Sequence, residues 1–334
     1  MHLVINSYGC SLSKSKGRFC IRSESGETFV SPEKVTAITL SNACSLTTDA
    51  VMLALEHDIP IVLLTRTGKP VGRFWSQYFG SIPTIRRNQL IWSSAPEGAD
   101  WVVHQLIQKA QLQIVHLQKL ADLRPKNSRE LKACCQYIES QIEKLSELSG
   151  KPIAEIAATL RGVEGSVSRV YFTRISDCLP PRYQFEGRSR RPAMDRFNAT
   201  LNYFYGMLYN LVETAIIAAG LDPALPVLHR DAYHKPSFAY DFIEPFRPWA
   251  DEIASSLCLQ KKLKSLHFQP KDAGEWLSDN GRALAVEVFD VFMDEKPGKS
   301  RGELPPRKQI FSDASSLAQS LLKYSTLPPE PVAA

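Results

Sequence analysis

The chain has 334 residues, of which 44% are hydrophobic and 22% are charged, and its formal net charge is +5. This composition is typical of a soluble globular protein long enough for two domains, and its mild positive charge permits a polyanionic partner without requiring one. The seven cysteines form no C-x-x-C pair, which argues against a zinc ribbon and a disulfide framework. The first residues lack the layout of a signal peptide and no apolar run is long enough for a membrane span, so we expect a cytoplasmic protein.

Residues 1–85 are rich in short apolar segments bounded by glycine and proline, which predicts strands. The expected strands are His2–Asn6, Arg18–Ser23, Thr28–Val30, Val35–Leu40, Ile59–Thr65 and Val71–Trp75. One helix is expected to begin after a cap at Thr48, and Thr67-Gly68-Lys69 suits a hairpin turn. Many short strands around one helix predict a small β-sandwich-like domain.

The rest of the chain is predicted to be helical. Apolar residues recur at helical spacing from Val103 to Ala121 and from Leu131 to Leu145, and Arg124-Pro125-Lys126-Asn127 between them indicates a helical hairpin. The fold class is therefore α+β, with a small N-terminal β-sandwich-like domain followed by a larger all-α catalytic domain. The expected division is 1–85 for the mainly-β domain, 86–98 for a linker, 99–324 for the helical domain and 325–334 for a disordered tail.

Glu164 lies inside a helix that Pro152 is expected to open. It shares a helix face with Leu160, Val167 and Tyr171. An acid within an apolar stripe is costly unless it is paired or bound to a metal, which makes Glu164 a candidate ligand. The alternative is an ordinary glutamate near a fraying helix end.

A basic loop follows this helix, between residues 181 and 196, and it precedes a long helix expected from Asn198 to Ala219. Arginine favours planar, bidentate recognition of phosphate, so the loop is a candidate polyanion site; a solvated surface loop is the alternative. Its arginines are Arg182, Arg188, Arg190, Arg191 and Arg196.

A charged and aromatic segment, H-R-D-A-Y-H-K-P-S-F-A-Y-D-F-I-E-P-F-R-P, begins at His229. Ser237 is expected to cap a helix in which Asp241 and Glu244, three residues apart, project from one face. Two carboxylates so close favour a cation between them, and a divalent metal suits them with His229 as a further ligand. Pro245 is expected to bend the helix just after the acids. The alternative is that the acids merely favour the helix dipole and that the histidine makes an ordinary hydrogen bond.

Three motifs occur in order along the chain: G-V-E-G-S-V-S-R-V-Y-F, then R-R-P-A-M-D-R-F-N-A-T-L-N-Y, then G-L-D-P…L-H…S-F-A-Y-D-F-I-E-P-F-R-P. Together they resemble the CRISPR adaptation integrase, the first of the universal Cas proteins, here called the Cas-one family. The resemblance covers the chain broadly and implies a metal site made by Glu164, His229 and Glu244, with Asp241 as an active-site residue near the metal. Some relatives have aspartate in place of Glu244, and either residue is a hard oxygen ligand.

The resemblance also implies the reaction. A Mg²⁺- or Mn²⁺-dependent DNA integrase and endonuclease would join the 3′-OH ends of a short DNA fragment to the CRISPR repeat by transesterification, which is spacer acquisition. The implied partners are double-stranded DNA, a second copy of the chain in a homodimer and the small Cas-two protein, with no membrane. The residues expected to hold DNA phosphates are Arg188, Arg190, Arg191 and Arg247.

Other functions remain open from the sequence alone. The first is a metal-dependent nuclease that cuts branched or single-stranded DNA without integration, because it would use the same ion and acids. The second is a non-catalytic DNA-binding scaffold, which the presence of Glu164, His229 and Glu244 disfavours. A metal-dependent hydrolase of small substrates is a third possibility, and the arginine loop disfavours it.

Overall fold

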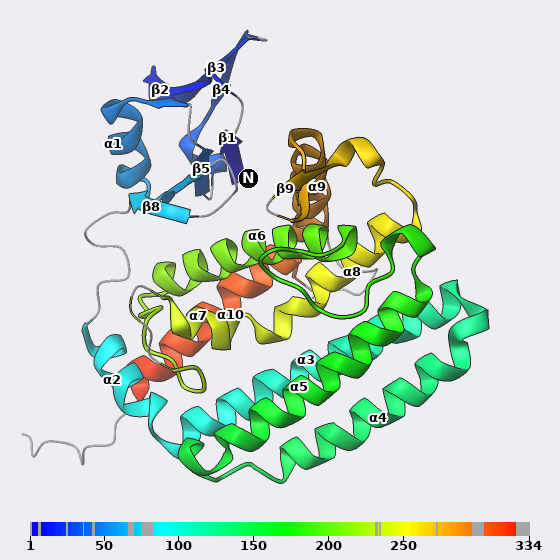
Figure 1. Ribbon diagram of the computed structural model, residues 1–334. Coiled ribbons are helices and arrows are strands. Elements are labelled where there is room, and N and C mark those ends of the chain that lie inside the picture. Colours follow the sequence, from blue (N-terminus) through cyan, green and yellow to red (C-terminus); the bar gives the residue numbers. More distant parts are fainter. Residues whose placement is uncertain are drawn as a thin grey trace, which may run out of the picture. The chain divides into compact units, whose positions relative to one another are not determined.

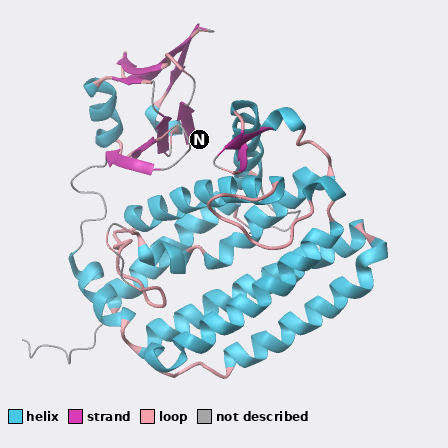
Figure 2. Cartoon of the chain, viewed as in Figure 1, coloured by secondary structure: helices cyan, strands magenta, loops and turns pink. Residues whose placement is uncertain are grey.

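The structure is a computed structural model in which the chain forms two compact units, Met1–Ser81 and Ile82–Ala334. The first unit contains most of the strands and the second most of the helices, which confirms the α+β class (Figures 1 and 2). The residues that the structure describes are 2–5, 8–24, 26–35, 37–41, 44–65, 70–74, 83–230, 233, 235–271, 273–295 and 304–324.

In its described residues, the N-terminal unit has two four-stranded sheets and the α-helix α1 (Thr48–Glu56). The first sheet has the order β1 (His2–Ile5), β5 (Ala37–Ser41), β7 (Ile61–Leu64) and β8 (Pro70–Phe74). The second has the order β4 (Gly26–Val30), β3 (Arg18–Ser23), β2 (Ser11–Ser15) and β6 (Ser45–Leu46). In the first sheet β1, β5 and β7 are parallel, and β8 is antiparallel to β7.

One apolar core joins both sheets and the helix of this unit. Leu3, Ile38 and Ile61 face one another across three neighbouring strands of the first sheet, and all three are buried. Leu12 and Phe19 of the second sheet belong to the same buried cluster. Burial of these side chains supplies the driving force for packing the sheets together, so the sandwich-like domain is confirmed.

Some local details of this unit differ from the predictions. Strands β2 and β6 were not expected, because S-L-S-K-S carries a single apolar side chain, Leu12, among small polar residues. Helix α1 is capped by Thr47, whose hydroxyl accepts from the backbone N–H of Ala50 at 3.3 Å, and not by Thr48. The expected hairpin turn over 67–69 lies outside the described residues.

The second unit is a set of packed helices with one two-stranded hairpin. Its helices are α2 (Pro83–Ser93), α3 (Pro96–Leu123), α4 (Ser128–Ser146), α5 (Ile153–Cys178), α6 (Arg196–Ala218), α7 (Ser237–Phe242), α8 (Arg247–Leu259), α9 (Asp279–Asp294) and α10 (Pro306–Lys323). Its hairpin pairs β9 (Phe268–Lys271) with β10 (Gly274–Leu277), and these strands were not anticipated. Short 3-10 turns are η1 (Pro32–Lys34) in the first unit and η2 (Pro125–Asn127), η3 (Pro181–Tyr183), η4 (Glu244–Phe246) and η5 (Ser265–His267) in the second.

Helices α3, α4 and α5 pack side by side, α8 packs on α3, and α6 packs on both α8 and α10 (Figure 1). The predicted hairpin of α3 and α4 is present, with the chain reversing at η2. Helix α8 and turn η4 contact α3 on one side, and α8 contacts α6 on the other. Among the described residues, no helix combines the length and the apolar run that crossing a bilayer requires.

The linker expected over 86–98 is helical instead, formed by α2 and the start of α3. Gln89 fastens α2 to the α6–α7 loop with hydrogen bonds in both directions, and Asn88 donates to two carbonyls at the end of α10. A Cβ on Gly98 would lie 2.3 Å from the carbonyl oxygen of Trp92, so only glycine lets the two helices meet this closely. The proline, serine and arginine residues suggested a loop, whereas the segment forms a helix because one of its faces is buried against the rest of the unit.

Candidate active site

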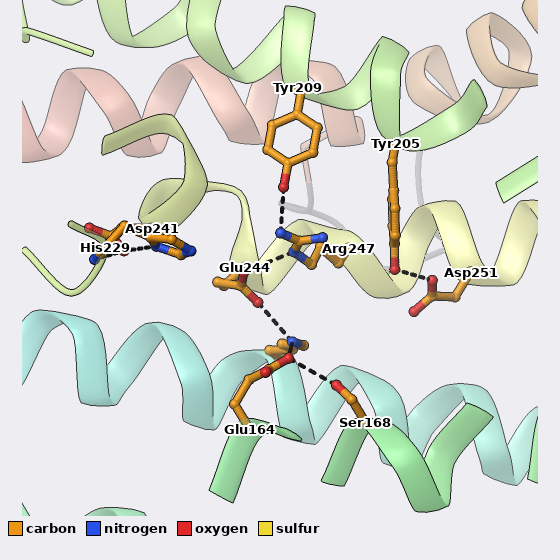
Figure 3. A network of polar contacts seen from close by, with 10 residues as sticks. Glu164, Ser168, Tyr205, Tyr209, His229, Asp241, Glu244, Arg247 and Asp251 are labelled. Atoms are coloured by element: carbon orange, nitrogen blue, oxygen red, sulfur yellow. Dashed lines mark hydrogen bonds and ion pairs between the residues drawn. The ribbon is translucent and has the colours of Figure 1, made fainter. Parts of the chain in front are cut away.

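The site is built around the point where helix α7 ends and the turn η4 leads into helix α8. Helix α7 begins at Ser237, but Pro236 is its N-cap residue and no side-chain cap bond is made, so the predicted capping role of Ser237 is wrong. The α-helix ends at Phe242, before Pro245, and Glu244 opens the 3-10 turn η4. Asp241 and Glu244 therefore belong to different elements and contact different partners (Figure 3).

Asp241 holds the loop that carries His229. Its side chain is buried, and Oδ2 accepts from the backbone N–H groups of Val227 and Leu228 at 2.7 and 3.0 Å. Oδ1 accepts from the backbone N–H of His229 at 3.2 Å and lies 2.6 Å from Nδ1 of its ring. Arg161 of α5 donates to the carbonyl of Leu228 at 3.2 Å. The segment from Val227 to His229 is thus held by both Asp241 and Arg161.

The contact with Asp241 also sets the chemistry of His229. A carboxylate only accepts hydrogen bonds, so Nδ1 carries the proton and Nε2 keeps its lone pair. The imidazole side chain is 41% exposed, whereas the Asp241 side chain is fully buried. A histidine held this way by a carboxylate presents Nε2 as a possible metal ligand.

Glu164 and Glu244 point toward one another (Figure 3), and both form ion pairs with the same lysine. Nζ of Lys109, on α3, donates to Oε1 of Glu164 at 2.5 Å and to Oε2 of Glu244 at 2.7 Å. Ser168 donates to Oε1 of Glu164 at 2.9 Å, and Arg247 donates through Nε to Oε1 of Glu244 at 2.9 Å. The cation between these carboxylates in the structure is therefore an ammonium group, which the sequence analysis did not identify.

Each of these groups stabilises the charged form of its partners. Burial by itself would raise the pKa of Glu164, but the charge and hydrogen bond of Lys109 outweigh it and lower that pKa to about 2. Burial is likewise outweighed at Glu244, where Arg247 and then Lys109 lower the pKa of the carboxyl. Burial would lower the pKa of Lys109, but the two carboxylates raise it. The two acids and the two bases form a neutral cluster of four charges.

Arg247 is held inside the protein by aromatic rings. Its guanidinium lies over the rings of Tyr205 and Tyr209, 5.1 and 5.3 Å from their centroids, and Nη2 donates to the Tyr209 hydroxyl at 2.5 Å. The Tyr209 ring meets that of Tyr240 edge-on, and Tyr240 meets His229 in the same way. Contacts therefore run from the histidine to the Glu244–Arg247 pair.

The four arginines expected to hold DNA phosphates fall into two groups. Arg188 donates to the side-chain oxygens of Asn198 and Asn202 and lies over the ring of Tyr205, and Arg247 is engaged as described. Arg190 and Arg191 are exposed. Phosphate contact thus stays a prediction for the exposed pair, while Arg188 and Arg247 have structural partners.

A second polar network lies next to the first and was not predicted. Tyr205 donates to Asp251 at 2.7 Å, and His116 contacts the hydroxyls of Tyr171 and Ser255 at 2.7 and 2.9 Å. Burial raises the pKa of Asp251 to about 6 and lowers the pKa of His116 to about 3, so the imidazole is neutral. These groups come from four helices, which explains why no local motif marks them.

A hollow of about 440 Å³ opens beside the site. It is lined by Gly165, Ser168, Arg169, Phe172, Thr173 of α5 and by Glu186, Gly187 and Arg188 of the following loop. Since Ser168 donates to Glu164, the hollow reaches the neighbourhood of the carboxylates. It offers room for a group larger than water.

The donor chemistry of the site fits a hard divalent cation. Two ionised carboxylates and an imidazole of fixed tautomer are the ligands that Mg²⁺ and Mn²⁺ accept, and the ammonium of Lys109 stands where a cation is required. The described residues do not include three or more such side chains already gathered as a ligand set. The two carboxylates therefore face each other across Lys109, and the ring of His229 faces Asp241.

The profile of the family described as CRISPR associated protein Cas1 matches residues 3–290. A CRISPR-associated endonuclease Cas1 from Archaeoglobus fulgidus is 28% identical over 309 residues, with 89% of each chain covered. Another from Rhodospirillum rubrum is 33% identical over 271 residues, covering 79% of this chain and 73% of its own.

Solved structures share the fold. A casposase bound to integration product superposes with a TM-score of 0.79 at 22% identity, covering 98% of this chain and 92% of its own. A Cas1 protein from Thermotoga maritima gives 0.77 at 21% identity, covering 98% and 99%. A chain of a Cas6-RT-Cas1–Cas2 complex gives 0.73 at 22% identity and covers 98% of this chain and 36% of its own.

Proposed function

The chain belongs to the family of CRISPR associated protein Cas1, and we propose that it is a metal-dependent DNA integrase and endonuclease of CRISPR adaptation. Its reaction would join 3′-OH ends of short DNA fragments to the CRISPR repeat by transesterification. The observation that carries this proposal is the pair of ionised carboxylates, Glu164 and Glu244, facing each other across a cation in the same helical unit as a carboxylate-held histidine. The names of the relatives, which are endonucleases, and the casposase with its integration product support the same chemistry.

We propose Glu164, Glu244 and His229 as ligands of Mg²⁺ or Mn²⁺. A divalent cation held there would supply Lewis-acid stabilisation of the charge that develops on a phosphodiester. The remaining tasks fall to the protein. Asp241 keeps the lone pair of His229 available, and Arg247 orients Glu244 and balances its charge.

DNA is the proposed substrate, and the exposed Arg190 and Arg191 are its proposed phosphate contacts. They lie in the loop between α5 and α6, and Arg191 is close enough to Tyr240 to lower the pKa of that phenol, although burial raises it overall. Because Tyr240 packs against His229, phosphates held by Arg191 would lie near the proposed reacting groups. A second copy of the chain and the small Cas2 protein are the proposed protein partners, and the complex that contains Cas1 and Cas2 supports the latter.

A strand-transfer assay tests the proposal. Purified protein, with and without Cas2, receives a labelled 3′-OH duplex and a plasmid that carries the repeat, in Mn²⁺ or in EDTA. We expect label to join the plasmid only with the metal, and we expect Glu164→Ala, His229→Ala and Glu244→Ala to abolish joining while the helical unit stays folded. Glu155→Ala and His104→Ala, exposed positions on α5 and α3, are matched controls that should keep activity. Full activity of His229→Ala would overturn the ligand assignment.

The same assay separates the alternatives. Metal-dependent cleavage without joined product, even with Cas2 present, would favour a nuclease without integration. DNA binding with neither product would favour a non-catalytic scaffold. In either case, the Glu164→Ala and Glu244→Ala variants show whether cleavage or DNA binding depends on the two carboxylates.

A further inference from the structure

Gln113 is a buried amide that the proposed reaction leaves without a role. It lies on α3 and is 1% exposed. Within the part of the chain that the structure describes, neither Oε1 nor Nε2 of its side chain has a hydrogen-bond partner in the protein. Buried polar groups without partners are costly, so one in the middle of a functional helix calls for an explanation.

Gln113 follows Lys109 by one helical turn. Residues four apart lie on the same helix face, and long side chains lean toward the helix N-terminus, so the amide of Gln113 leans over the turn that carries Lys109. On its other side is His116, which is already bonded to Tyr171 and Ser255. Gln113 thus offers an unused acceptor on the same helix face as Lys109, one turn away.

The proposed metal site creates a need for such a pivot. Oε1 of Glu244 is bonded by Arg247 and Oε2 by Lys109, and Oε1 of Glu164 is bonded by Lys109 and Ser168. A divalent ion that bound both carboxylates would stand next to the ammonium group, and like charges repel strongly where water is excluded. The ammonium is itself almost fully buried, so solvent would not screen the repulsion.

We propose that Lys109 is a displaceable internal cation: it bridges Glu164 and Glu244 in the metal-free protein and moves to Oε1 of Gln113 when a divalent metal binds. This inference rests on the proposed metal site. It explains two observations together, the ammonium in the place of a metal and the unpartnered amide one turn away. Lys109 is a positioning residue in this scheme, since it keeps the two carboxylates together until the metal replaces it.

Calorimetric titration of Mn²⁺ into the full chain tests the exchange without any activity measurement. Lys109→Met should bind Mn²⁺ about tenfold more tightly than wild type or better, because no ammonium has to leave. Gln113→Leu should bind several-fold more weakly, because the displaced ammonium loses its acceptor. In the Lys109→Met background, Gln113→Leu should have no effect on affinity. Lys119→Met and Gln111→Leu, at exposed positions of the same helix, should leave affinity unchanged.

The double-variant cycle is the decisive part. Removing a buried positive charge raises the affinity for any cation, so tighter binding by Lys109→Met is expected from electrostatics alone, and the coupling to Gln113 is what distinguishes displacement. Wild-type affinity in Gln113→Leu, or equal effects of Gln113→Leu with and without Lys109, would overturn the inference while leaving the metal site in place. Should Lys109→Met fail to fold, Gln113→Leu alone still tests the displacement. That variant is expected to fold, because the substitution removes a polar group that has no partner in the protein.

Failure of the proposed function gives a different result. If neither the wild type nor Lys109→Met binds Mn²⁺, or if both bind it as well after Glu164→Ala, there is no metal at these carboxylates. Both proposals would then be wrong.

Discussion

Replacing Asp241 by asparagine removes one negative charge from a carboxylate that accepts four hydrogen bonds. The donors are the backbone N–H groups of Val227, Leu228 and His229 and the Nδ1–H of the His229 ring. The substitution keeps the size of the side chain, so it creates neither a cavity nor a clash. What changes is the pattern of donors and acceptors.

An asparagine has one acceptor oxygen and one amide nitrogen that only donates. With its oxygen toward Val227 and Leu228, its NH₂ group faces Nδ1 of His229, which must then accept. The ring proton moves to Nε2, and the histidine loses the lone pair that a metal requires. In the opposite orientation, the NH₂ group faces two backbone N–H groups, and the loop loses its anchor.

The structure sets the size of both effects. The Asp241 side chain is 0% exposed, so water does not replace a lost contact. Losing charge-assisted hydrogen bonds here should lower the free energy of unfolding by about 2–3 kcal/mol. Reversing the tautomer of a metal-binding histidine should reduce metal affinity or activity by about 10–100-fold.

Stability is measured by urea unfolding followed by tryptophan fluorescence. Four of the five tryptophans lie in the helical unit, so the signal reports mainly on the part that holds the site; they are Trp92, Trp101, Trp249 and Trp276. Activity is measured by strand transfer. In a His229→Ala background, which has no joining activity left to lose, Asp241→Asn should still lower the free energy of unfolding. An Asp241→Asn protein with wild-type stability and wild-type joining rates would refute the reasoning.

Two further predictions concern charge. Because burial raises the pKa of Asp251 from 3.8 to about 6, the folded protein keeps a proton that the unfolded chain releases, and this contribution to stability is lost as pH rises through that window. Asp251→Asn should therefore gain about 3 kcal/mol on the wild type between about pH 4 and pH 7 in urea unfolding, and a constant difference would contradict it. Replacing Arg190 and Arg191 by alanine should weaken DNA binding and reduce the slope of log affinity against log salt by about 2, whereas Arg188→Ala should act mainly on stability; an unchanged slope would return the loop to solvated surface.

The helical hairpin of α3 and α4 could be predicted because its evidence is local. Apolar residues repeat with the helical period over both segments, and Pro125 lies between them. Helix α2 could not, because its polar composition describes the exposed face, while its buried face is fixed by Gln89 bonding to a loop 133 residues away. Local pattern thus predicts the long elements and misses those that tertiary contacts hold.

The same division applies to the site. Glu164 was predicted from its place in an apolar stripe, and the structure brings it to Glu244 across α3. Lys109 could not be predicted, because it lies 55 residues from Glu164 and 135 from Glu244 in the sequence. No spacing rule connects residues so far apart, and a lone lysine in a helix is ordinarily a solvated one. The structure places the ammonium group of Lys109 between the two carboxylates, and the metal expected there stays a prediction.

The arginines show a further limit of the sequence, which did not indicate their partners within the protein. Arginine was expected to bind planar phosphate groups, whereas in the structure Arg247 donates to the Glu244 carboxylate and lies over the rings of two tyrosines. Residue type predicted the chemistry of the partner but not whether that partner would be nucleic acid or the protein itself. Phosphate contact stays a prediction, and Arg190 and Arg191 are best placed for it because the fold leaves them on the surface.

The neutral cluster formed by Lys109, Glu164, Glu244 and Arg247 is hard to explain by stability alone. Well-packed apolar residues in place of buried ion pairs often leave a protein as stable or more so, even where the charges keep one another ionised. Substituting any one of the four residues would destabilise the protein, since it leaves a buried charge without its partner. A core that retains such groups gains something other than stability from them. In this chain the gain we infer is a pair of carboxylates kept ionised and together, ready to exchange an internal ammonium for an external metal ion.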